Sequence, residues 1–198
     1  AETALGAILL FSRRLNYLVK PLQGQNRLKS QDNIPLPEEL SGKTVGIVGL
    51  GNMGRALVPR VRSLGMRVLA TARRIRKDSD GVDQMFATEE LPEMLKTSDF
   101  VVVSVPLTAD TNAMVGKSFL KSMKPSAFLI DLSGRPQIYK YGAIVTAIRE
   151  KWIAGVCLQP SDYEPEVGMP LSTSSFWELE NVVVTPYLSP LWRWKKHP

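Results

Sequence analysis

Short apolar runs alternate along this chain with segments in which apolar residues recur at helical spacing. Strands are predicted over residues 44–48, 67–71, 85–87, 100–105, 127–132, 153–158 and 181–185, and helices over residues 2–20, 52–64, 89–96, 117–122 and 143–150. The predicted strands are mostly continuous runs of Val, Ile and Leu, which is typical of strands that helices bury on both faces. The alternation therefore predicts an α/β fold with a doubly wound parallel sheet.

The composition narrows the class of protein. Hydrophobic residues make up 44% of the 198 positions, which is enough to fill a core. The single cysteine, Cys157, excludes an internal disulfide framework, and with one histidine, His197, a dedicated zinc site is not expected. The apolar run at residues 7–11 is much shorter than the roughly 18 residues that a membrane span needs, and no basic stretch precedes it. A soluble, cytoplasmic protein with no membrane partner is expected.

The formal net charge of +6 raises the question of a nucleic-acid partner. The basic residues do not form one long block, because they gather at residues 73–77 and near the end of the chain at Arg193, Lys195 and Lys196. We interpret the terminal group as a solvated end of the chain. No nucleic-acid partner is therefore expected, and the group at residues 73–77 is considered below as part of a ligand site.

A glycine motif, G-x-G-x-x-G, follows the first predicted strand directly and opens the next helix. Gly49 permits the tight turn out of the strand, Gly51 lets the backbone approach a pyrophosphate, and Gly54 lets the helix pack closely on the sheet. The backbone N–H groups of Asn52 and Met53 then point toward the phosphates, where the helix dipole favours negative charge. The alternative is a structural glycine turn, but the strand-turn-helix-strand context favours dinucleotide binding.

The residues after the second strand of this motif depart from its usual form. An acidic residue is normally found there, because a carboxylate accepts hydrogen bonds from the ribose of an NAD-type cofactor. This chain has Ala72, Arg73 and Arg74 instead. Ala72 removes the repulsion of a 2′-phosphate, and two guanidinium groups offer donors to it. The arginines could also be two solvated loop residues, but the pattern favours NADP(H) over NAD(H).

Several segments together resemble the D-isomer-specific 2-hydroxyacid dehydrogenases, the group with glyoxylate/hydroxypyruvate reductases and phosphoglycerate dehydrogenase. They are LSGKTVGIVGLGNMGRAL, SVPLTADTNAMVG, LKSMKPSAFLID, IAGVCL and FWELENVVVTP. The resemblance extends over nearly the whole chain, and ATARR is similar to the NADPH-using reductases of the family. It implies a Rossmann cofactor domain and hydride transfer between nicotinamide and a small 2-keto or 2-hydroxy acid.

The resemblance also implies a domain organisation. Residues 1–40 are expected to form an N-terminal helix and a connecting arm, residues 41–186 the NAD(P)-binding Rossmann domain, and residues 187–198 a truncated return segment toward the substrate domain. The family builds its substrate domain mostly from residues that precede the first helix of this chain, so we expect that domain to be largely absent. Members usually dimerise through the cofactor domain, which predicts a homodimer in which residues 1–40 take part.

The family's functional residues can be transferred only where the motifs match. For the cofactor, the resemblance adds Val105, Pro106, Thr111, Leu132, Ser133 and Gln159 to the glycine motif and the arginines. Gln159 stands where the family has an aspartate near the nicotinamide carboxamide; an amide still forms hydrogen bonds but carries no charge.

The catalytic half of the motif set is altered. The family uses an arginine for the substrate carboxylate, a histidine as acid and base, and a glutamate that orients the histidine. The glutamate matches Glu164 in YEP, and the arginine matches Arg135, although an ungapped alignment puts Gly134 in its column. The histidine is replaced by Tyr187 in TPY.

Three functions remain open from the sequence. The first is an NADPH-dependent 2-ketoacid reductase in which Tyr187 substitutes as proton donor or is a spectator. The second is a catalytically degenerate protein that binds NADP(H) and serves in dimerisation or regulation. The third, a dimerisation domain indifferent to nucleotide, is disfavoured by the complete glycine motif and the paired arginines.

Overall fold

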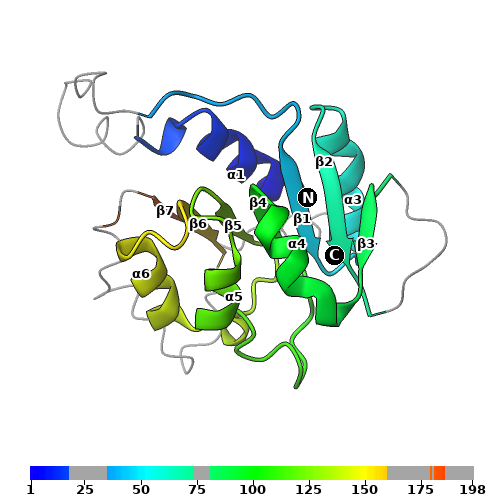
Figure 1. The fold of residues 1–198 in the computed structure, drawn as a ribbon, viewed down its shortest axis with the longest axis vertical. Helices are drawn as coiled ribbons and strands as arrows, with labels where there is room; N and C mark the ends of the chain where they lie inside the picture. The colour runs from blue at the N-terminus through cyan, green and yellow to red at the C-terminus, as the bar shows by residue number, and fades with distance from the viewer. Residues whose placement is uncertain (18–34, 74–80, 160–178, 180, 186–198) are drawn as a thin grey trace, which may run out of the picture.

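The computed structural model describes residues 1–17, 35–73, 81–159, 179 and 181–185. Within them, a seven-stranded sheet runs in the order β3-β2-β1-β4-β5-β6-β7, and all neighbouring strands are parallel (Figure 1). The strands are β1 (Thr44–Val48), β2 (Arg67–Thr71), β3 (Gln84–Phe86), β4 (Phe100–Val103), β5 (Phe128–Asp131), β6 (Gly155–Leu158) and β7 (Val182–Val184). The predicted α/β fold with a doubly wound parallel sheet is confirmed.

Helices cover both faces of the sheet (Figure 1). One face carries α1 (Glu2–Ser12) and α3 (Asn52–Arg62), and the other carries α4 (Leu91–Thr97), α5 (Lys117–Ser122) and α6 (Tyr141–Arg149). Two short 3-10 helices, η2 (Thr88–Glu90) and η3 (Pro136–Ile138), precede α4 and α6. Neighbouring strand residues divide between the two cores, as Ile47 and Val48 do, because successive side chains of a strand point to opposite faces.

The N-terminal helix is shorter than predicted. It ends at Ser12, and Arg14 adopts a φ of 57° before a further helical turn at residues 15–17. The Arg14 side chain donates a hydrogen bond to the Leu36 carbonyl and forms an ion pair with Glu38, which ties the bend to the connecting arm. The apolar spacing continues through the bend, so the sequence does not reveal it. The remainder of the predicted helix lies outside the described residues.

The strand order reverses between β1 and β4. From β1 the chain winds through β2 and β3 to one edge, whereas from β4 it winds through β5 and β6 toward β7 at the other edge. The loops that follow β1 and β4 therefore leave in opposite directions, which opens a crevice at the carboxyl ends of these strands. At its floor, the Ser104 hydroxyl donates a hydrogen bond to the Gly49 carbonyl over 2.9 Å.

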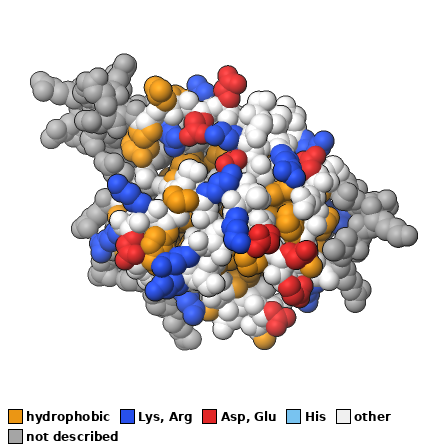
Figure 2. Space-filling view, in the orientation of Figure 1, with side chains coloured by type: hydrophobic (Ala, Val, Ile, Leu, Met, Phe, Trp, Pro, Cys, Tyr) orange, Lys and Arg blue, Asp and Glu red, His pale blue; other side chains and the backbone are white. Residues whose placement is uncertain are grey.

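Four further features of the described part of the chain concern membranes, metals, charge and the cysteine. No helix there is long and apolar enough to cross a membrane, and no three His, Cys, Asp or Glu residues there could hold a metal ion together. On the face drawn in Figure 2, Lys and Arg side chains are interspersed with Asp and Glu. Burial raises the pKa of the Cys157 thiol to about 12, which disfavours the thiolate that a nucleophile requires.

Candidate functional site

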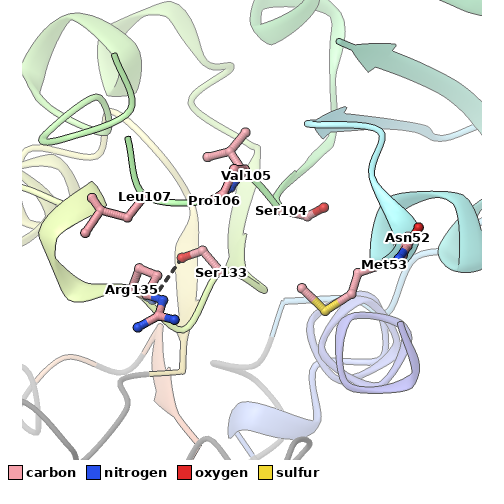
Figure 3. Close-up of a pocket in the computed structure, with 8 residues that line it drawn as sticks. All are labelled: Asn52, Met53, Ser104, Val105, Pro106, Leu107, Ser133 and Arg135. Carbon is pink, nitrogen blue, oxygen red and sulfur yellow. Dashed lines mark hydrogen bonds between the residues drawn. The ribbon is translucent and has the colours of Figure 1, made fainter. Parts of the chain in front are cut away.

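Two cavities lie next to each other at the carboxyl edge of the sheet. The large cavity, about 740 Å³, is lined by the glycine turn, the end of β2, the start of α4 and the segment after β4. The small cavity, about 580 Å³, is lined by Asn52, Met53, Ser104, Val105, Pro106, Leu107, Ser133 and Arg135 (Figure 3). Residues 104–106 belong to both cavities, so this segment is their common wall. Each volume is typical of a site for one small organic molecule or one half of a larger one.

The glycine turn adjoins both cavities. Gly49 and Gly51 line the large cavity, and Asn52 and Met53 line the small one. Gly49 has a φ of +94°, and its N–H donates a hydrogen bond to the Thr71 carbonyl at the end of β2. This hydrogen bond ties the turn to the end of β2, and residues of the turn line both cavities.

The other two glycines have different surroundings. A Cβ on Gly54 would lie 2.7 Å from the Gly49 carbonyl oxygen and 3.0 Å from a methyl carbon of Ile47, so α3 approaches β1 here as closely as the motif predicts. A Cβ on Gly51 would meet nothing within 4 Å, which leaves space for a ligand beside the backbone. Gly51 is the N-cap residue of α3 and offers no side-chain cap, so the helix presents its positive end to the crevice.

Arg73 is one of the residues that line the large cavity. It is exposed and lines the cavity together with Thr71 and Ala72. Ala72, directly before it, supplies no carboxylate, whereas Glu89 and Asp110 line other parts of the cavity. Arg74, predicted to act with it, lies outside the described residues.

The segment after β4 carries three of the predicted cofactor residues. Val105 and Pro106 line both cavities, and Thr111 lines the large one. The Thr111 hydroxyl donates a hydrogen bond to the Pro106 carbonyl over 2.7 Å and accepts one from the Thr108 N–H over 2.8 Å. In this structure Thr111 therefore fixes the shape of the common wall through its own hydroxyl.

Arg135 is the catalytic candidate whose position is described. Its side chain lines the small cavity, and its backbone N–H donates a hydrogen bond to the Ser133 hydroxyl over 3.1 Å (Figure 3). Gly134, the other candidate for this role, has a φ of +59° and no side chain to bring to the cavity. Glu164 and Tyr187, the other two catalytic candidates, lie outside the described residues.

A buried carboxylate organises the loop that carries Arg135. Asp131, at the end of β5, accepts hydrogen bonds at Oδ1 from the Ser133 N–H (2.6 Å), the Ser133 hydroxyl (2.7 Å), the Gly134 N–H (3.3 Å) and the Tyr139 hydroxyl (2.6 Å). Its Oδ2 accepts from the Gln159 N–H over 3.3 Å. Burial raises the pKa of Asp131, while the bonds from Tyr139 and Ser133 favour its charged form.

Two predicted cofactor residues are buried beneath the site. Leu132 packs in the core on the α1 and α3 face of the sheet, and Gln159 is 3% exposed. Neither is among the residues that line the two cavities. Both follow the carboxyl ends of central strands, so each can contact a ligand in the crevice only through backbone groups or after a side-chain movement.

Other residues of the site were not identified from the sequence. Ser104 lines both cavities and holds the glycine turn, and the large cavity also includes Glu89, Thr108 and Asp110. Asp131 and Tyr139 were missed as well. A sequence signal exists for Ser104 and Asp131, because each is a polar residue directly at the end of an apolar strand run, where parallel strands deliver side chains to the crevice.

Comparison with known proteins gives the family. Residues 5–189 match the model of the D-isomer specific 2-hydroxyacid dehydrogenase, NAD binding domain. A glyoxylate reductase from Thermococcus gammatolerans is 37% identical over 153 residues, which is 77% of this chain and 44% of that protein.

Two solved structures are similar in fold. A probable 2-hydroxyacid dehydrogenase from Rhizobium etli, in complex with NADP, HEPES and L(+)-tartaric acid, is 27% identical, with a TM-score of 0.79 over 94% of this chain and 56% of that one. A D-isomer specific 2-hydroxyacid dehydrogenase from Xanthobacter autotrophicus, in complex with NADPH and MES, is 28% identical, with a TM-score of 0.76 over the same shares.

The matched part is thus only about half of each relative, in agreement with the expectation that the family's substrate domain is largely absent from this chain. The match of the family model to residues 5–189 covers the sheet, the glycine turn and both cavities. The chain belongs to the D-isomer specific 2-hydroxyacid dehydrogenase family, of which it contains the NAD-binding domain.

Proposed function

We propose that this chain is the cofactor half of an NADP(H)-dependent 2-ketoacid reductase, which transfers hydride between nicotinamide and a small 2-keto or 2-hydroxy acid. The observation that carries the proposal is the pair of cavities that share residues 104–106, with Arg73 among the residues that line one and Arg135 among those that line the other. A dinucleotide has two halves joined by a pyrophosphate, and the glycine turn stands between the two cavities. The adenosine half then occupies the large cavity and the nicotinamide half the small one.

The residues present fit such a cofactor. The open space beside Gly51 and the N-terminus of α3 suit the pyrophosphate, and Asn52 and Met53 follow at the first turn of the helix. Arg73 then meets a 2′-phosphate, with Arg74 as a second donor. The NADP and NADPH in the relatives from Rhizobium etli and Xanthobacter autotrophicus support this preference. When bound, the nicotinamide supplies or accepts the hydride.

Arg135 is proposed to bind the substrate carboxylate. A guanidinium group matches a carboxylate with two parallel hydrogen bonds, and the small cavity places this side chain beside the space assigned to the nicotinamide. The proposed proton donor is Tyr187, whose phenol, with an unperturbed pKa of about 10, stays protonated at pH 7. Glu164 is proposed to orient that donor, as its place in the family motif implies.

A homodimer is also proposed, and the surface of α1 supports it. The helix buries Ala4, Ala7, Ile8 and Phe11 against the sheet, yet Leu9 on its other side is 37% exposed. Leu15, in the helical turn that follows, is 42% exposed. A helix that is apolar on its outer side as well is typical of one that a further surface covers.

The alternative proposal is a catalytically degenerate protein that binds NADP(H) and acts in dimerisation or regulation. The observation that favours it is Tyr187 in place of the family histidine. A protonated phenol is a poor base near neutral pH compared with imidazole. Tyrosine in place of histidine should therefore slow oxidation of a 2-hydroxy acid more than reduction of a 2-keto acid.

Replacement of Tyr187 by histidine separates these two functions. In a protein that joins this chain to a substrate domain of the family, Tyr187→His is expected to increase kcat for glyoxylate reduction at pH 7 by at least about tenfold, because general acid–base catalysis contributes about 10²- to 10⁴-fold. Tyr187→Phe is the control and should lower the rate. Ordinary turnover of about 10 s⁻¹ that survives Tyr187→Phe would show that another residue donates the proton. An inactive Tyr187→His protein that still binds NADPH favours the degenerate alternative.

A further inference from the structure

The loop between β5 and α6 is closed at its base by two buried side chains. Asp131 ends β5, Tyr139 follows η3, and the Tyr139 hydroxyl donates a hydrogen bond to Asp131 Oδ1 over 2.6 Å. Both residues are 5% exposed or less. This bond joins the two ends of the segment at residues 132–138, which carries Ser133 and Arg135 into the small cavity.

A second set of bonds extends from the carboxylate into the loop. Ser133 donates to Asp131 Oδ1 through its N–H and its hydroxyl, and the same hydroxyl accepts the Arg135 N–H over 3.1 Å (Figure 3). The Arg135 backbone is thus linked to Asp131 through one intervening side chain. Because Gly134 has a φ of +59°, the backbone turns sharply between these two residues and depends on side-chain bonds to keep one conformation.

The second oxygen of the carboxylate reaches the neighbouring strand. Asp131 Oδ2 accepts the N–H of Gln159, which directly follows β6. A carboxylate is costly to bury and is retained where several donors satisfy it. The donors come from two loop residues, from Tyr139 and from the residue after β6, so the loop that follows β5 and the end of β6 converge on Asp131.

We propose that Asp131 and Tyr139 are positioning residues, whose buried hydrogen bond, transmitted through Ser133, fixes Arg135 and the wall of the small cavity at the nicotinamide end of the cofactor. The expected effect on cofactor binding rests on the proposed function, whereas the expected effect on the conformation of the loop does not. The expected effect is confined to the small cavity, because none of these residues lines the large cavity.

The test uses Tyr139→Phe and two ligands. NADPH reaches both cavities, whereas adenosine 2′,5′-bisphosphate has no nicotinamide half and needs the large cavity alone. By calorimetry, the variant is expected to bind NADPH about tenfold more weakly, since a hydrogen bond to a charged group is lost, and adenosine 2′,5′-bisphosphate within about twofold of the unmutated chain. In the ligand-free protein, the amides of Ser133 and Gly134 should exchange hydrogen about tenfold faster.

The matched control is Asp99→Asn. Asp99 also accepts hydrogen bonds, from the Thr44 N–H and from Lys124 over 2.8 Å each. It precedes β4, however, and so lies at the amino ends of the strands, away from the two cavities. This control should lower the melting temperature and leave the ratio of the two affinities unchanged. If Tyr139→Phe fails to fold, Ser133→Ala replaces it, with faster exchange of the Arg135 amide as the expected result.

Each result of these measurements supports or overturns either the inference or the proposed function. Equal weakening of both ligands indicates a general structural role and overturns the inference, as does an unchanged ratio together with unchanged amide exchange. If the unmutated chain binds neither ligand, the proposed function fails, and amide exchange still decides whether Asp131 and Tyr139 hold the loop. Selective loss of NADPH affinity with faster exchange at residues 133 and 134 supports the inference.

Discussion

Replacing Gly49 with alanine is expected to weaken dinucleotide binding by at least about a hundredfold and to lower the melting temperature. At its φ of +94° an alanine is strained by about 1–2 kcal/mol. The new Cβ would also lie 2.7 Å from a methyl carbon of Val105 and 3.0 Å from the Ser104 carbonyl oxygen. Relief of these contacts has to move either the glycine turn or the common wall of the two cavities. Calorimetry with NADPH and thermal unfolding measure the two effects.

Two other glycines provide matched controls for this substitution. Gly142→Ala, in α6, adds a Cβ in open space away from the cavities and should leave both binding and stability unchanged or slightly improved. Gly51→Ala also meets nothing within 4 Å, so it should leave stability unchanged while it weakens binding, because the space it fills is assigned to the pyrophosphate. NADPH affinity of Gly49→Ala equal to that of the unmutated chain would contradict the assignment of this turn.

The second large effect is expected at Arg73. Arg73→Ala should weaken NADPH binding by about tenfold to a hundredfold and leave NADH binding unchanged, since a charge-assisted hydrogen bond contributes about 1.5–3 kcal/mol. Arg73 lines the large cavity, and Ala72 beside it has no carboxylate that would repel a 2′-phosphate. The additional substitution Arg74→Ala should enlarge the effect. The measurement is the ratio of NADPH and NADH dissociation constants by calorimetry.

The control for this prediction is Arg67→Ala. Arg67 begins the same strand, β2, but its side chain donates a hydrogen bond to Gln84 and is not among the residues that line the cavities. Its removal changes the net charge as Arg73→Ala does and should leave the ratio of the two affinities unaltered. A similar loss of affinity for NADPH and NADH in Arg73→Ala would mean that Arg73 contacts a part shared by both cofactors.

The sequence predicted those features that depend on neighbouring residues. The glycine turn between β1 and α3, the close packing at Gly54 and the position of Arg73 after β2 all follow from one continuous segment of about thirty residues. The parallel sheet follows from the same logic, because strands that alternate with helices are typical of parallel βαβ units. The line of residues at the carboxyl edge could therefore be located before the structure was known.

Features that depend on distant contacts could not be predicted in this way. The bend at Arg14 is fixed by contacts with Leu36 and Glu38. The apolar spacing of the helix carries no information about these contacts. Asp131 meets Tyr139 and Gln159 only because β5 and β6 are neighbours and the loop returns beneath the crevice. The burial of Leu132 has the same origin. A family motif indicates which residues belong to the site, but it does not distinguish residues that contact a ligand from residues that position the contacting ones.

The most direct test of the account is a calorimetric titration of this 198-residue chain with NADPH and, separately, with NADH. One NADPH per chain should bind at least about tenfold more tightly than NADH, because the charge-assisted bonds to the 2′-phosphate are made only with NADPH. The same titration with adenosine 2′,5′-bisphosphate should retain this phosphate-dependent part of the affinity. Absence of binding by both dinucleotides, or NADH affinity equal to that for NADPH, would contradict the account.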